Sequence, residues 1–93
     1  MIKLHNLMED EVEYIIDKLL KKRKDVCSCE KCRLDIEAIS LNNLPPKYVV
    51  TKMGEIYERL DIMNFQFEAD LVKEVEKAIQ IVKDSPHHTD MER

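Results

Sequence analysis

Cys27-Ser28-Cys29-Glu30-Lys31-Cys32 contains all three cysteines of this 93-residue chain. The stretch is polar, and it interrupts two flanking segments whose apolar residues recur at helical spacing. Three unrelated buried thiols are one interpretation, but they would be expected in an apolar setting. An odd number of cysteines and the absence of a visible secretory signal disfavour a disulfide framework. A redox pair is a weaker interpretation of Cys29 and Cys32, because no βαβ pattern surrounds them.

Zinc binding is the interpretation that this spacing favours. Three thiolates on a short knuckle can occupy three corners of a tetrahedron at ~2.3 Å from the metal. The complex would carry one negative charge, which Lys24, Lys31 and Arg33 would stabilise. A catalytic zinc would keep its fourth position for water. No motif near the cysteines supplies a convincing general base, since Glu30 and Glu37 are expected to be surface charges.

A structural zinc site needs a fourth ligand from elsewhere in the chain. The sequence offers His5, His87, His88 and Asp90. His87 and His88 follow Pro86, which is expected to end the last helix. The open coordination position favours these imidazoles over an ordinary solvated tail.

Helices are expected on both sides of the cysteines. Residues 6–24 form one amphipathic pattern, in which Asn6 and Glu9 resemble a capping box. Its apolar positions are Met8, Val12, Ile15, Ile16, Leu19 and Leu20. A second helix is expected from about residue 30 to 41, with an apolar face formed by Leu34, Ala38 and Leu41 and flanked by Ile36 and Ile39. Pro45 and Pro46 then predict a non-helical elbow, followed by a short helical turn through Tyr48 and Val49.

Residues 54–84 also have helical periodicity, and the pattern does not settle whether the helix breaks near residues 61–64. Unbroken, this helix would span roughly 45 Å, whereas a compact domain of this size measures about 30 Å across. We therefore expect its overhanging stripe to be covered by a second copy in a homodimer. The stripe consists of Phe67, Leu71, Val75, Ile79 and Val82.

Composition fits a small all-α protein. Hydrophobic residues make up 44% and charged residues 37% of the chain, and a single glycine argues against an all-β fold. The expected architecture has two shorter N-terminal helices, a zinc knuckle and a long C-terminal helix. No window approaches the ~20 apolar residues of a membrane span. We expect no membrane association and a cytoplasmic location.

Charge is unevenly distributed along the chain. The net charge is −4, yet residues 18–33 contain seven basic and two acidic residues, a local excess of +5. This segment makes a nucleic-acid-binding zinc knuckle the alternative function. The overall negative charge and an aromatic content of only 5% argue against that alternative.

The stretch from Cys27 to Val49 resembles the signature of the late-competence ComFB family. The matching features are the C-x-C-x-x-C knuckle, Asp35-x-x-Ala38-x-x-Leu41-Asn42 and Leu44-Pro45-Pro46-x-Tyr48-Val49. The resemblance extends over residues 4–86. It implies a bacterial, non-enzymatic all-α protein with a zinc-stabilised knuckle, usually dimeric. It also implies a fourth cysteine just after the terminal Ser-Pro, where this chain has His87 and His88 instead.

The resemblance further implies a regulatory or adaptor role linked to competence or related signalling, and some relatives are reported to bind cyclic dinucleotides. Such a ligand needs cations and stacking groups. The residues available around the elbow are Arg33, Lys47, Tyr48, Lys52 and Arg59. We expect residues 1–86 to form the helical domain and 87–93 a polar tail. His88 is the preferred fourth zinc ligand, ahead of His87 and then Asp90.

Overall fold

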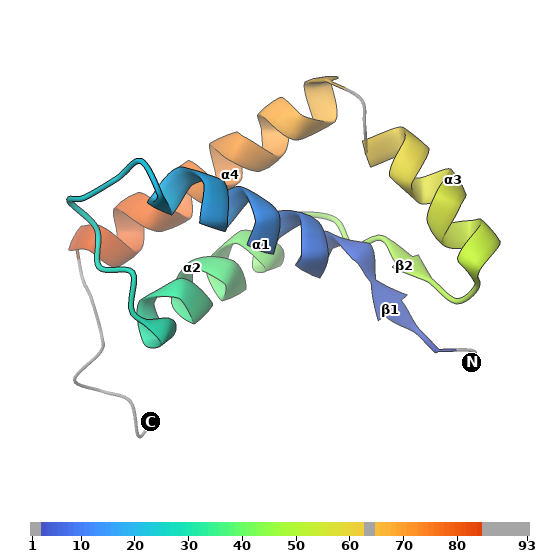
Figure 1. Cartoon of the computed structure of the whole chain (residues 1–93), viewed down its shortest axis with the longest axis horizontal. Coiled ribbons are helices and arrows are strands. Elements are labelled where there is room, and N and C mark those ends of the chain that lie inside the picture. Colours follow the sequence, from blue (N-terminus) through green and yellow to red (C-terminus); the bar gives the residue numbers. More distant parts are fainter. Residues whose placement is uncertain (1–2, 63–64, 85–93) are drawn as a thin grey trace.

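The computed structural model describes residues 3–62 and 65–84 and confirms the all-α class (Figure 1). Four helices account for most of these residues, and a ribbon of two very short strands pairs the segment before α1 with the connection between α2 and α3. The elements in chain order are β1 His5–Asn6, α1 Leu7–Leu20, α2 Glu30–Asn42, β2 Tyr48–Val49, α3 Lys52–Ile62 and α4 Phe65–Asp84. Within the described ranges, no helix combines the length and apolar character needed to cross a bilayer.

Helix α1 begins where the sequence predicts and ends four residues early. The Asn6 side chain accepts a hydrogen bond from the backbone N–H of Met8 at 3.1 Å, which confirms Asn6 as the N-cap. The last buried residue of the helix is Leu20. The predicted extension through Lys24 is wrong, because residues 21–24 are consecutive basic residues with no apolar side chain to pack on the core.

The elbow after Pro46 is extended, so the predicted helical turn through Tyr48 and Val49 is wrong. Strand β2 pairs antiparallel with β1, with His5 opposite Val49 and Asn6 opposite Tyr48. The Asn6 Oδ1 atom also accepts the backbone N–H of Lys47 at 2.9 Å. One asparagine therefore caps α1 and fixes the start of a strand about forty positions away in the chain, a contact that no local pattern could reveal.

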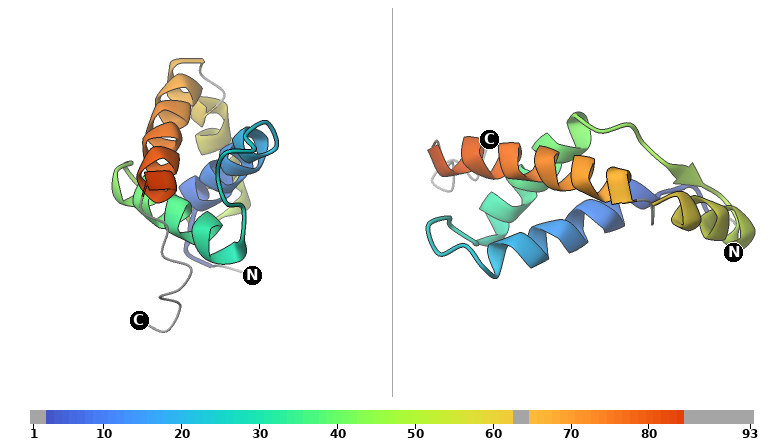
Figure 2. Two further views of the ribbon diagram at one scale, coloured as in Figure 1. Left: turned by 90° about the vertical axis from the view of Figure 1, so that its left-hand side faces the viewer. Right: turned by 90° about the horizontal axis from the view of Figure 1, so that it is seen from above.

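Helices α1, α2 and α4 form the body of the molecule and enclose its core (Figure 2). The buried residues are Met8, Val12, Ile15, Ile16, Leu20, Val26, Cys32, Ile36, Leu71, Val75, Ala78, Ile79 and Val82. On α2 the fully buried line is Cys32, Ile36 and Ser40. The predicted face was wrong in part, because Leu34 is 54% exposed and Ala38 is also exposed.

The predicted 54–84 helix consists of two helices that point in different directions (Figure 1). Helix α3 ends at Ile62 and lies away from the body, near the β ribbon, whereas α4 begins at Phe65 and packs on α1 and α2. Twenty residues of α4 span about 30 Å, so α4 does not overhang a molecule 42 Å long. Four residues of its stripe are buried within the chain and Phe67 is half-buried, so the overhang from which the dimer was predicted is absent, and the homodimer itself stays a prediction.

Candidate metal centre

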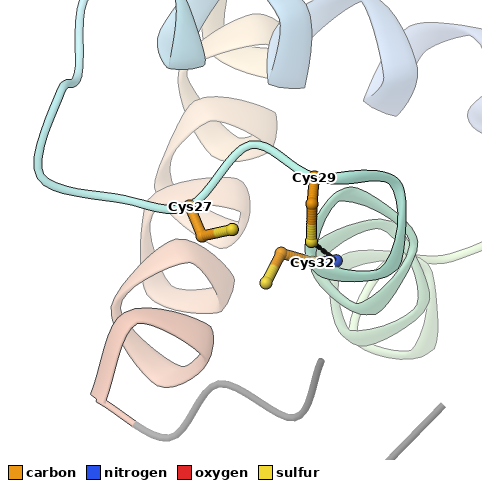
Figure 3. A group of neighbouring side chains, drawn as sticks. All are labelled: Cys27, Cys29 and Cys32. Carbon is orange, nitrogen blue, oxygen red and sulfur yellow. Dashed lines mark hydrogen bonds between the residues drawn. The ribbon is translucent and has the colours of Figure 1, made fainter. Parts of the chain in front are cut away.

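The three cysteines meet where the connection after α1 enters α2 (Figure 3). Cys27 lies on the connection, Cys29 is the N-cap of α2, and Cys32 lies in its first turn. Their sulfur atoms all lie within 4.8 Å of one another. All three are thiols in this structure. The arrangement places three soft ligands around one point.

Local structure explains why the sulfurs converge. The Cys29 Sγ atom accepts a hydrogen bond from the backbone N–H of Cys32 at 3.4 Å, which turns that side chain over the start of α2. Cys32 is fully buried in the core. Val26 is only 8% exposed and anchors the connection to the same core, so that Cys27 follows directly beside α2.

The environment of the thiols makes metal binding dependent on pH. Burial, ahead of the hydrogen bonds with Cys29 and Cys27, raises the pKa of the Cys32 thiol to about 12. A metal ion must therefore displace a tightly held proton from Cys32, and its own positive charge supplies the compensation. Coordination by all three sulfurs would release protons and weaken in acid.

Two of the cations expected to support the thiolates are engaged with carboxylates. The Lys31 ammonium lies 2.7 Å from both carboxylate oxygens of Asp35, and Arg33 pairs with Asp17 on α1. Lys24 is exposed on the connection. The positive field around the cysteines is thus weaker than the basic sequence indicates, because local ion pairs offset part of it.

The same pairing reduces the basic character of residues 18–33 as a whole. Lys18 pairs with Glu68 at 3.4 Å and Arg23 with Asp25 at 3.0 Å, in addition to the pairs of Lys31 and Arg33. The remaining basic residues, Lys21, Lys22 and Lys24, are exposed at the end of α1. The +5 segment is therefore a smaller cationic surface than its composition predicts.

The end of α4 lies beside the cysteines. The Lys83 ammonium contacts the Asp25 carboxylate at 2.7 Å, although the two residues are 58 positions apart. The hydrogen bonds from Arg23, followed by this contact with Lys83, hold the pKa of Asp25 well below its usual range. The end of the last helix therefore lies beside the connection that follows α1. No local sequence pattern predicts a role for Asp25, because its partner Lys83 is 58 positions away in the chain.

The candidates for the fourth ligand differ in position. His5 lies on β1, toward the opposite end of the molecule from the cysteines, where its Nε2 atom is 2.9 Å from Asp10 (Figure 1). His5 therefore cannot complete the site within one chain. His87, His88 and Asp90 lie outside the described residues. His88 follows Asp84 by four positions, and an extended chain of that length reaches up to ~14 Å.

The residues expected to bind a nucleotide are not all together. Arg33 lies at the cysteine end of α2, whereas the other four lie around β2 and α3 at the other end (Figure 1). The Arg59 guanidinium on α3 contacts Glu55 at 3.0 Å and Glu11 of α1 at 3.2 Å, and these carboxylates raise its pKa. Arg59 thus fastens α3 to α1.

An open cavity of about 530 Å³ lies between the ribbon and the start of α3. Its lining residues are Lys3, His5, Val49, Val50, Thr51, Lys52 and Glu55. Lys47 is adjacent in sequence to β2, with its ammonium 3.6 Å from Glu58 and 5.7 Å from the centre of the Phe67 ring. Tyr48 is 58% exposed on β2. Of the five residues predicted to bind a nucleotide, Lys52 is therefore the one that lines this cavity.

Comparison with known proteins agrees with this architecture. The family described as late competence development protein ComFB matches residues 5–86. The competence protein ComFB of Bacillus subtilis (strain 168) is 24% identical over 83 residues, which cover 89% of this chain and 85% of that protein. A solved structure of the late competence protein ComFB from Bacillus subtilis has a TM-score of 0.78 at 23% identity, covering 94% of this chain and 98% of the other, and supports the same fold. Because the family match extends over nearly the whole sequence, this chain belongs to the ComFB family.

Proposed function

We propose that this ComFB-family chain is a non-enzymatic regulatory or adaptor protein, linked to competence or related signalling, whose cysteines bind one structural zinc ion. The observation that carries the zinc assignment is the convergence of the Cys27, Cys29 and Cys32 sulfurs within 4.8 Å. Thiolate sulfurs select zinc over magnesium or calcium. Bound zinc would join the connection after α1 to the first turn of α2. We assign the protein to the cytoplasm, where reducing conditions keep such thiols available.

We propose that the tail, residues 87–93, follows the helical domain of residues 1–86 and supplies the fourth ligand, with His88 ahead of His87. The position of Lys83 beside Asp25 supports this proposal, because it brings the last described turn of α4 to the connection that carries Cys27. A histidine ligand must be neutral, so zinc affinity should weaken toward pH 6.

Metal analysis tests the zinc site. Protein purified without added metal should contain about one zinc per chain, and Cys29→Ser should lose most of it together with folding free energy on the order of several kcal/mol. Ser28→Ala, a change at an exposed neighbour, is the matched control and should retain the metal. Less than about half an equivalent of zinc in wild type with intact thiols would contradict the proposal.

Truncation after Pro86 tests the fourth ligand separately. The truncated chain should bind zinc more weakly than the full chain, and the double variant His87→Ala/His88→Ala should match the truncation. If the truncated and full chains share the same zinc affinity and thermal midpoint, the tail is not a ligand. The zinc assignment itself would survive that result.

We further propose that a cyclic dinucleotide binds near the ribbon and the start of α3. The cavity beside Lys52 and the exposed ring of Tyr48 support this location, because one can hold phosphate oxygens and the other can stack on a base. Calorimetric titration with a panel of cyclic dinucleotides tests it. Lys52→Ala should weaken binding, whereas Lys73→Ala on the exposed side of α4 should not.

Nucleic acid binding remains the second candidate, favoured by the three exposed lysines that follow α1, namely Lys21, Lys22 and Lys24. Plain single- and double-stranded DNA belong in the same titrations. DNA binding that falls steeply with added salt, without any cyclic dinucleotide binding, would favour this candidate instead.

A further inference from the structure

We propose that Cys29 and Cys32 form an oxidisable pair that reacts with a hydroperoxide, and that their disulfide releases the bound metal. The oxidation of the pair stands on the thiol geometry alone. The release of metal rests on the zinc site proposed above.

The two thiols differ in access but share one helical turn. Cys29 is exposed at the N-cap of α2, whereas Cys32 is fully buried three residues later. The Cys29 sulfur lies over the first turn, 3.4 Å from the backbone nitrogen of Cys32 (Figure 3). The two sulfur atoms already lie within 4.8 Å of each other, so a modest adjustment of the side chains brings them into disulfide range. A peroxide would therefore reach Cys29, and Cys32 would complete the bond.

Cys27 is a poorer partner for either residue. It lies on the connection outside α2, and only Ser28 separates it from Cys29. The backbone of Cys29 is held by α2, because its carbonyl oxygen accepts the N–H of Arg33 at 2.9 Å. Cys29 and Cys32 thus belong to one rigid turn, whereas Cys27 depends on the path of the connection.

The chemistry balances in two steps. The Cys29 sulfur attacks one peroxide oxygen, the O–O bond breaks, and a sulfenic acid forms with release of water or alcohol. The Cys32 sulfur then attacks the sulfenic sulfur, and a second water leaves with the Cys32 proton. The two sulfurs lose two electrons in total, and the peroxide is reduced by two.

Disulfide formation would remove two of the three sulfur ligands from the metal. Cys27 and one tail ligand would be left, which falls short of the four-coordinate site that a structural zinc requires. The connection after α1 would then lose its link to the start of α2. Because this link lies beside the end of α4, oxidation would alter the end of the molecule where three segments meet.

The experiment uses the full chain, purified without oxygen and titrated with hydrogen peroxide. A chromophoric chelator should record about one zinc released per chain, and peptide mass spectrometry should find a Cys29–Cys32 cross-link with a mass loss of about 2 Da. Dithiothreitol with added zinc should reverse both changes. Cys27→Ser is the matched variant and should still form the cross-link, whereas Cys32→Ser should leave Cys29 as a sulfenic acid that dimedone traps.

Two results would overturn the proposal. One is zinc retained at peroxide levels that oxidise free cysteine. The other is a cross-link in the wild-type protein that involves Cys27 in place of Cys29 or Cys32. This second result is read from the wild-type protein, so it does not depend on whether any variant folds. A purified chain that holds no zinc but still forms the Cys29–Cys32 bond would instead refute the proposed zinc function and leave the oxidisable pair intact.

Discussion

Glu37 shows how packing changes the chemistry of one residue. It lines a small cavity of about 180 Å³ between α1 and α2, together with Glu13, Glu30 and Arg33. Burial is the main cause that raises the pKa of the Glu37 carboxyl, followed by the charges of Glu13 and Glu9, while Arg33 opposes the shift. The sequence prediction that Glu37 is an ordinary surface charge misses this environment.

We expect Glu37→Gln to stabilise the protein at neutral pH. The unfolded chain ionises Glu37 more readily than the folded chain, so stability falls as pH rises through the window between the two pKa values. Glutamine removes that penalty, by less than about 1 kcal/mol because solvent screens a partly exposed site. Thermal melts at pH 7 should show the gain, and it should close below about pH 4. An equal gain at pH 3.5 and pH 7 would contradict the electrostatic explanation.

Ser40 is the second residue with an unusual environment. It is fully buried on α2, and its hydroxyl oxygen has no hydrogen-bond partner among the residues that the structure describes. We expect Ser40→Ala to raise the free energy of unfolding by about 1 kcal/mol, because the alanine buries no unpaired polar group. Urea denaturation measures the change, with exposed Ser28→Ala as the neutral control. A destabilised Ser40→Ala protein would mean that the hydroxyl has a partner in solution.

At the scale of the elements, hydrogen bonds to Thr51 hold the start of α3. The Thr51 hydroxyl accepts the backbone N–H of Gly54 at 3.1 Å, and the Thr51 carbonyl accepts that of Glu55 at 3.0 Å. A Cβ atom on residue 54 would lie 3.3 Å from the capping hydroxyl, which explains why glycine suits this position. Together with the Arg59 contact to Glu11, this cap is what positions α3 outside the main core.

We expect Thr51→Ala to destabilise α3 by about 1 kcal/mol, because the helix would lose its N-terminal hydrogen bond. Amide hydrogen exchange should show faster exchange in α3, with little change in α4. Thr51→Ser keeps the hydroxyl and is the matched control. If both variants exchange alike, the cap does not stabilise the helix.

For the whole molecule, an exposed apolar surface lies on the neighbouring elements β2 and α3, whereas Ile81 is the exposed large apolar residue on the described part of α4. Its members are Tyr48, Met53, Ile56 and Tyr57, each more than half exposed. Since α4 is covered within the chain, we propose that a second copy covers this surface, through a symmetric contact between the two α3 helices. The molecule is elongated, 42 × 30 × 20 Å, and α3 forms one end of it, where such a contact is unobstructed.

Light scattering should therefore give about twice 11.0 kDa at micromolar concentration. Ile56→Glu should shift the protein toward the monomer, because it places a charge at the centre of the proposed contact. Ile81→Glu on α4 is the matched control, since Ile81 is 54% exposed and outside this surface. A monomer in wild type, or equal effects of the two substitutions, would rule out this dimer.

Local features of the fold were readable from the sequence. The Asn6 cap and the start of α2 near Glu30 both depend on residues a few positions apart. The cysteine cluster is also local, because six consecutive residues and one helical turn bring the three sulfurs together. Such short-range chemistry acts wherever the segment lies in the molecule.

Tertiary structure alone decided which surfaces meet. Helix α2 has apolar residues on several sides, and only packing against α1 and α4 buries Cys32 and Ile36 while Leu34 stays exposed. Strand β2 forms because β1 pairs with it. The apolar stripe of α4 is shielded from water because α1 and α2 pack against it. Lys83 reaches Asp25 for the same reason. These contacts join residues that are far apart in the chain, so their energies depend on the whole arrangement and leave no periodic trace in the sequence.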